Sequence, residues 1–256
     1  MLMYHRVRDD LPPGPLIIGV KAFREQMKYL KRHCHVISIK HMCAYYADGL
    51  PIPGSRRPQV VITFDDGYRD TYTHAFPVLK EFGLEAAVFL ATDFIGTDRK
   101  MATYSHLTGT DMLSWQEAGA MQATGHITFA AHTASHPHLP QLDYAQQKKE
   151  IASSIKAVEE HLSEKTALSI FCYPYGQYNQ DSLDLMRELG IKIALTVRDG
   201  FNTGKENPHE IKRICADGTF TLAEFMRRLN PLPHWLQWRI DMLKDYQKKI
   251  FSGRRV

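Results

Sequence analysis

Two adjacent aspartates, Asp65 and Asp66, directly follow the apolar run Val60–Phe64. Such a run is typical of a strand that is buried on both faces. Two like charges at its end repel each other, and each loses hydration. Asp-Gly is a common turn dipeptide, so one interpretation is a polar turn that merely ends the strand. The other interpretation is that a positive charge lies beside the two carboxylates.

Two histidines follow a second predicted strand, 126–131, within the stretch HTASHPHL. His132 and His136 are four residues apart, a spacing that puts both rings on one side of a helical turn, where they can share a metal. Pro137 favours a single turn or a loop over a long helix. This spacing alone is common, but both the histidines and the aspartates follow predicted strands, so all four can converge on one face of a barrel.

One aspartate and two histidines form a three-ligand metal set that leaves positions open for water and substrate. Such a metal is a Lewis acid and lowers the pKa of bound water. The second aspartate could then act as the general base on the attacking water, kept ionised by the metal. The pattern therefore predicts metal-assisted hydrolysis, with Zn²⁺, Co, Ni or Fe as the divalent metal.

The elements that must position these residues alternate between strand and helix. Predicted strands are 2–5, 35–39, 58–64, 85–91, 126–131, 167–173, 191–197 and 211–215, and predicted helices are 22–33, 70–82, 115–124, 143–162, 180–189 and 222–229. Pro77 permits helix 70–82 only with a kink or a break. This alternation predicts an α/β fold with a parallel sheet, closed or nearly closed into a barrel, and outer helices. Loop 92–113 is long enough to form a lid or a cleft wall.

Composition narrows the class of protein. The chain has 256 residues with 44% hydrophobic and 23% charged residues, which is ordinary for a soluble globular protein. A net charge of +4 is too small to indicate nucleic-acid binding. The cysteines lack CxxC spacing and are expected as free buried thiols. No membrane span or secretory leader is recognisable, so the chain on its face is cytoplasmic, or its leader is absent from this sequence.

The motifs TFDDGY, HTASHP and YPYG together resemble those of the polysaccharide deacetylases, carbohydrate esterase family four. The first two in this order are highly specific, and the resemblance covers roughly residues 1–215. It implies a distorted (β/α)7 barrel that removes N- or O-acetyl groups from sugars, with 1–230 as the catalytic domain. The opening MLMYHRV resembles a circularly permuted subgroup that includes exported bacterial deacetylases of poly-N-acetylglucosamine.

The resemblance implies a role for each matching residue. Asp65 would be the base, and the metal ligands, usually of zinc, would be Asp66, His132 and His136. Tyr175 would offer its backbone N–H to the oxyanion, although YPYG is also a turn. In the permuted subgroup the general acid follows a short N-terminal strand, as His5 does here; the alternative is a surface histidine. The residues expected to contact the sugar are Tyr68, Pro174 and Tyr175.

One position departs from the family pattern. Many relatives carry an arginine three residues before the tyrosine of the third motif, where it orients the base, but this chain has Cys172 there. Arg213, in the predicted strand 211–215, could reach the same aspartate instead. The alternative is an ordinary salt bridge at a strand end.

Residues 231–256 form a basic amphipathic segment outside the resemblance. Such a segment can pack on the barrel or on a partner chain, lie on an anionic membrane surface, or remain disordered. The oligomeric state is not predicted.

The resulting prediction is a metal-dependent deacetylase of an N-acetylglucosamine polymer or oligomer, in which activated water attacks the acetyl carbonyl. Two alternatives stay open. One is a hydrolase of a non-sugar amide on the same fold, since substrate choice depends on loops such as 92–113. The other is a non-catalytic carbohydrate-binding barrel.

Overall fold

The structure is a computed structural model that describes residues 1–52, 54–101, 112–162 and 169–230. The predicted tail 231–256 and the central part of loop 92–113 lie outside the described residues. So do the first two residues of the predicted strand 167–173.

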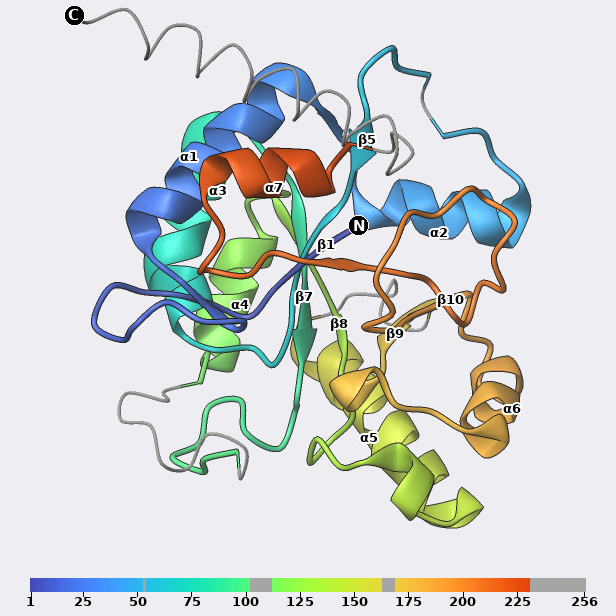
Figure 1. Cartoon of the computed structure of the whole chain (residues 1–256). Coiled ribbons are helices and arrows are strands. Elements are labelled where there is room, and N and C mark those ends of the chain that lie inside the picture. The colour runs from blue at the N-terminus through green and yellow to red at the C-terminus, as the bar shows by residue number, and fades with distance from the viewer. Residues whose placement is uncertain (53, 102–111, 163–168, 231–256) are drawn as a thin grey trace, which may run out of the picture.

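Seven parallel strands form the central sheet, in the order β10-β9-β8-β7-β6-β1-β11. Their bounds are β1 Leu2–Tyr4, β6 Ile62–Phe64, β7 Ala86–Leu90, β8 Ile127–Ala131, β9 Ile170–Cys172, β10 Ile193–Leu195 and β11 Ile214–Cys215. The two edges of the sheet approach each other. Ile211, three residues before β11, donates a backbone hydrogen bond to Ala194 in β10 and accepts one from Thr196, directly after β10. The sheet therefore curls into a barrel, which confirms the predicted architecture of parallel strands with helices outside (Figure 1).

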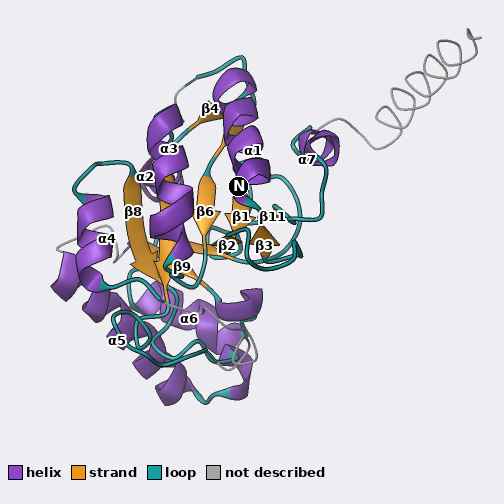
Figure 2. Cartoon of the chain, turned by 90° about the vertical axis from the view of Figure 1, so that its left-hand side faces the viewer, coloured by secondary structure: helices purple, strands orange, loops and turns teal. Residues whose placement is uncertain are grey.

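The helices surround the strands (Figures 1 and 2). Their bounds are α1 Val20–His33, α2 Ile39–Asp48, α3 Phe76–Phe82, α4 Trp115–Gln122, α5 Tyr144–Leu162, α6 Gln180–Glu188 and α7 Leu222–Arg228. The N-terminal ends of α4 and α7 carry the capping boxes that Ser114 and Thr221 make with glutamates three residues later. None of the helices within the described ranges is long and apolar enough to cross a membrane.

Three elements differ from the sequence prediction. The predicted strand 58–64 is divided into β5, Gln59–Val60, and β6, which belong to different sheets. The predicted strand 35–39 is a strand only at β4, His35–Val36, which pairs with β5, Gln59–Val60, in a small separate sheet. Helix α2 then begins at Ile39 and was not predicted. Its buried residues Ile39, Met42 and Cys43 have helical spacing, and Gly49 ends it in a left-handed conformation (φ 65°), so the signal was present in the sequence.

The predicted helix 70–82 is broken near Pro77, as expected. A π-helical turn, η1, spans Thr71–Ala75, and α3 starts anew at Phe76 with the proline in its first turn. Proline is tolerated there because the first backbone N–H groups of a helix have no intrahelical acceptor. Beside β1, the short strands β2, Arg6–Val7, and β3, Ile17–Ile18, form a second small parallel pair.

An aromatic cluster fastens α1 to the two strands that precede the predicted base and acid. Phe23 of α1 makes edge contacts with Tyr4 of β1 and Phe64 of β6, at centroid distances of 5.3 and 5.9 Å. Tyr4 and Phe64 in turn stack at 5.4 Å. All three rings are buried, so this packing sets where the following residues, His5 and Asp65, emerge from the sheet.

We predict that Phe23→Ala lowers the free energy of unfolding by about 3–5 kcal/mol, because it leaves a cavity between the helix and both strands. Urea unfolding followed by circular dichroism measures this change. Phe201→Ala is the matched control, since Phe201 is 41% exposed, and its effect should stay within about 0.5 kcal/mol. Equal losses in the two variants would contradict the packing described here.

Candidate active site

The predicted chemical residues meet at the carboxyl ends of the strands. Asp65 and Asp66 follow β6, His5 follows β1, and His132 and His136 follow β8. His5 Nε2 lies 3.9 Å from an Asp65 oxygen, and His136 Nε2 lies 3.3 Å from Asp66 Oδ1. Chain segments far apart in sequence therefore converge because parallel strands end at the same face of the barrel.

The backbone of this face is strained. Among the described residues other than glycine, positive φ angles occur at Asp66 (75°), Thr133 (64°), His136 (57°) and Tyr175 (56°). All four follow strands β6, β8 or β9. A left-handed conformation costs a residue with a side chain roughly 1–2 kcal/mol, and such strain concentrates at functional sites.

Asp66, His132 and His136 form a cluster with the composition of a metal site. Their ligand atoms all lie within 4.8 Å of one another. His132 Nδ1 donates a hydrogen bond to the carbonyl oxygen of Cys172 at 2.7 Å, so its Nε2 carries the lone pair and faces Asp66 at 3.6 Å. Burial lowers the pKa of His132 to about 4, so the ring is neutral near pH 7, the form that binds metals. The residues thus fit a divalent cation such as Zn²⁺, with the carbonyl fixing the tautomer of one ligand.

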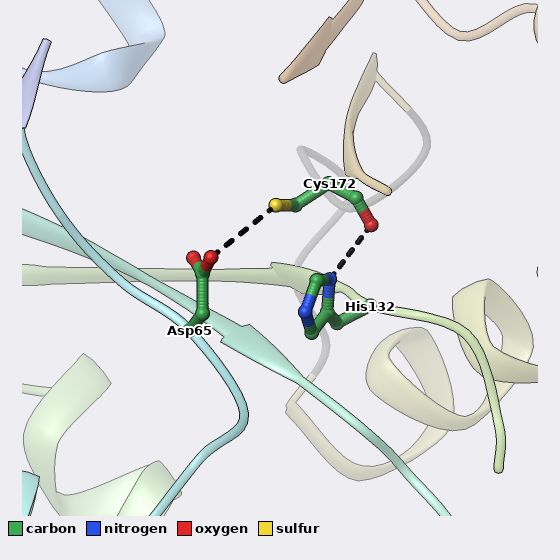
Figure 3. A group of neighbouring side chains, drawn as sticks. All are labelled: Asp65, His132 and Cys172. Atoms are coloured by element: carbon green, nitrogen blue, oxygen red, sulfur yellow. Dashed lines mark hydrogen bonds between the residues drawn. The ribbon is translucent and has the colours of Figure 1, made fainter. Parts of the chain in front are cut away.

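A second cluster of potential ligands, Asp65, His132 and Cys172, is equally compact (Figure 3). It is a poor metal site, because Arg213 donates to both oxygens of Asp65 and lies 3.1 Å from Cys172 Sγ. A cation there would face a buried guanidinium. Burial also raises the pKa of the Cys172 thiol well above its ordinary value, whereas metal binding needs the thiolate. Asp66 and the two histidines therefore fit a metal ion better than this second cluster does.

Asp65 is held by a buried ion pair. The two terminal nitrogens of Arg213 each donate to one carboxylate oxygen at 2.7 Å, and the Arg213 side chain is 0% exposed. Arg213 Nε also donates to the Thr196 carbonyl at 2.8 Å, and a terminal nitrogen donates to Thr63 Oγ1 at 3.2 Å. Burial by itself would raise the pKa of Asp65, but the charge and hydrogen bonds of Arg213 outweigh burial and hold that pKa well below its usual range. Asp65 is therefore ionised, and Arg213 reaches it from the segment that joins the two sheet edges.

The other predicted site residues occupy different surroundings. The His5 side chain is 12% exposed, and its buried Nδ1 has no hydrogen-bond partner among the described residues. Tyr175 is half-buried; its ring stacks on His138 at 4.0 Å and meets the edge of the His136 ring at 4.6 Å. Pro174 is buried in the turn before it. The expected role of Tyr175 toward an oxyanion stays a prediction.

Tyr68 lies in the interior, only 1% exposed. The Arg6 guanidinium lies 4.4 Å from the centre of its ring, and its hydroxyl is 3.8 Å from Met101 Sδ. In this structure the Tyr68 ring contributes to interior packing. Its expected contact with a sugar stays a prediction.

Sequence analysis missed Asp70, which links the two segments that carry the predicted acid and base. Its carboxylate accepts hydrogen bonds from Arg6 Nε at 2.9 Å and from the Val7 backbone N–H at 3.1 Å. The segment directly after His5 is thereby tied to the turn that starts at Asp65. In the sequence Asp70 indicates only a helix start, because its partners lie more than sixty residues away.

The chain is similar in sequence and in fold to known proteins. A family model described as polysaccharide deacetylase matches residues 54–194. The chain is 29% identical over 217 residues to a putative polysaccharide deacetylase, YxkH, of Bacillus subtilis strain 168, covering 84% of this chain and 70% of the relative. It is 28% identical over 233 residues to a poly-beta-1,6-N-acetyl-D-glucosamine N-deacetylase of Staphylococcus epidermidis, covering 83% and 77%. It shares its fold with the Streptococcus pyogenes deacetylase PplD in complex with acetate, with a TM-score of 0.77, 22% identity, and coverage of 90% and 97%.

We predict that Arg213→Met destabilises the protein by about 3–5 kcal/mol at pH 7, because it leaves the Asp65 charge buried and unpaired. In the wild type the lowered pKa of Asp65 adds stability above about pH 4, and this contribution is lost as pH falls toward the folded-state pKa. In the variant burial dominates and raises that pKa, so the deficit relative to wild type should shrink when urea unfolding is repeated at pH 4.

Arg198→Met is the control for this prediction, since Arg198 pairs with Glu210 but its side chain is 59% exposed. Its effect should be at most about 1 kcal/mol. A deficit in Arg213→Met that is small, or independent of pH, would show that the buried pair does not set the charge of Asp65.

Proposed function

The chain belongs to the polysaccharide deacetylase family, and we propose that it removes acetyl groups from an N-acetylglucosamine polymer or oligomer in a metal-dependent hydrolysis. The observation that carries this proposal is that two adjacent carboxylates have different partners. Asp65 is paired with a buried arginine, whereas Asp66 faces two histidines. Adjacent groups of the same type thus have different partners, as different chemical roles require.

Asp66, His132 and His136 are the residues that would hold the cation. When bound, a divalent metal supplies a Lewis acid and lowers the pKa of water. Asp65, ionised by Arg213, is the group that takes a proton from the attacking water. The bidentate arginine also fixes the plane of the carboxylate, so its free lone pairs keep one direction.

His5 is the group that we assign to protonate the leaving amine. Its Nε2 lies 3.9 Å from Asp65, so acid and base can act on the same bound acetamido group. Tyr175 would donate its backbone N–H to the oxyanion. Its position beside His136, and the left-handed backbone that sets the direction of this turn, support that assignment.

The proposal of an N-acetylglucosamine substrate rests on the relatives. The Staphylococcus epidermidis relative is named for deacetylation of poly-beta-1,6-N-acetyl-D-glucosamine. The half-buried rings of Tyr175 and His138 add a stacked aromatic surface next to the metal-ligand cluster. Aromatic surfaces of this kind contact the apolar faces of sugars. Pro174 lies in the turn that carries the Tyr175 ring.

We predict that protein stripped with a chelator releases no acetate from β-1,6-linked N-acetylglucosamine oligomers, and that stoichiometric Zn²⁺ restores release. An enzyme-coupled acetate assay measures this. Substitution of Co, Ni or Fe for zinc in the same assay ranks the metals. If zinc is bound but no acetylated sugar releases acetate, the sugar proposal fails and a non-sugar amide becomes the better substrate class.

We predict that His5→Gln lowers kcat by about 10²–10⁴-fold, because the amine must leave without a positioned proton donor. Zinc affinity should stay unchanged, because His5 is not one of the proposed metal ligands. His74→Gln is the control, as His74 is an exposed histidine of η1. Unchanged kcat in His5→Gln would remove His5 from the mechanism.

A further inference from the structure

The loop between the two histidine ligands has a backbone that needs external support. Residues 132–136 include two left-handed positions, Thr133 (φ 64°) and His136 (φ 57°). Within the loop, Thr133 Oγ1 accepts a hydrogen bond from the His136 N–H at 3.1 Å. Outside it, the carbonyls of Thr133 and Ala134 accept from the backbone N–H groups of Thr92 and Asp93. These contacts leave the N–H groups of the loop centre to be satisfied.

A single carboxylate on helix α5 binds that centre. Glu150 Oε2 accepts from the backbone N–H of Ser135 at 2.8 Å and from that of Ala134 at 3.1 Å, and the Ala134 N–H also donates to the Glu150 backbone carbonyl at 3.1 Å. Glu150 Oε1 accepts from Ser135 Oγ at 2.7 Å. Three donors of the loop therefore converge on one ionised group, and hydrogen bonds to a charged acceptor are stronger than neutral ones.

The position of Glu150 is itself fixed by packing. The next residue of α5, Ile151, is buried, and so are Ile155 and Val158 on the same helix face. Helix α5 also makes extensive contact with β8, the strand that ends directly before His132. The loop follows β8, and the helix that carries Glu150 packs on β8. This shared contact limits the movement of Glu150 relative to the loop.

We propose that Glu150 is a positioning residue for the metal ligands His132 and His136, an inference that rests on the proposed metal-dependent function. It touches neither the metal ligand atoms nor the reacting groups. Its three hydrogen bonds hold the strained loop in the one conformation in which both imidazoles face Asp66. Removing an outer partner of this kind typically weakens metal binding or activity by about 10–100-fold.

The test is the zinc affinity of the metal-free full chain, measured by competition with a chromophoric chelator. In Glu150→Gln one acceptor oxygen is replaced by an NH2 group, which donates and cannot accept, so the Kd for zinc should rise about 10–100-fold. Ser135→Ala removes a single bond and should give a smaller rise in the same direction. Glu160→Gln, on the exposed face of the same helix, should leave the Kd unchanged. Addition of excess zinc should restore much of the lost acetate release in Glu150→Gln.

A second readout separates positioning from general stability. The visible absorption of the Co²⁺-substituted protein reports ligand geometry and should change in Glu150→Gln but not in Glu160→Gln. A Kd within twofold of wild type together with an unchanged cobalt spectrum would overturn the inference. If Glu150→Gln does not fold without metal, an unchanged Kd in folded Ser135→Ala would overturn it equally. If the wild-type chain itself binds no zinc, the proposed metal site fails first, and this inference falls with it.

Discussion

The buried ion pair between Asp65 and Arg213 is the interaction on which the active face depends. Two adjacent carboxylates on a buried turn cannot both remain ionised without compensation, because burial and mutual repulsion both oppose their charges. Arg213 compensates one of them through two hydrogen bonds of 2.7 Å, and the other faces His132 and His136, with which it would hold the proposed cation. The same pair also bears on barrel closure, since Arg213 lies between Ile211, which bonds to the β10 edge, and β11, which pairs with β1. The partner of Asp65, the proposed base, therefore lies in the segment that joins the two edges of the sheet.

The strained turns around this pair need a rigid scaffold. Four left-handed residues, at roughly 1–2 kcal/mol each, represent a sizeable fraction of the stability of an ordinary domain. The parallel sheet supplies part of the support, because β7 and β8 are buried along their whole length. Tertiary hydrogen bonds supply the rest: Asp70 ties the segment after His5 to the turn that starts at Asp65, and Glu150 binds the loop between the histidines.

The convergence of the site residues could be predicted from the sequence, because it follows from the topology of the sheet. Strand–helix alternation predicts parallel strands, whose carboxyl ends share one face, and Asp65, Asp66, His132 and His136 each follow such an end. Cys172 stands where many relatives carry an arginine, and Arg213 was the candidate replacement because it lies in another predicted strand, 211–215, from which it could reach the same aspartate. Contacts that depend on tertiary register could not be predicted. The bonds from Glu150 to the histidine loop, and the carbonyl of Cys172 that fixes the His132 tautomer, have no local sequence signature. Helix α2 was missed because the short β-like stretch before it was extended too far.

The central claim is that the two adjacent aspartates have separate roles, and a paired comparison of Asp65→Asn with Asp66→Asn tests it most directly. Zinc affinity and acetate release would be measured on both variants with the same N-acetylglucosamine oligomer. Asp65→Asn should keep zinc affinity near that of the wild type and lose acetate release, whereas Asp66→Asn should lose zinc affinity first and recover part of its activity at high zinc. Equal loss of zinc affinity in the two variants would contradict the account, because it would mean that both carboxylates bind the metal.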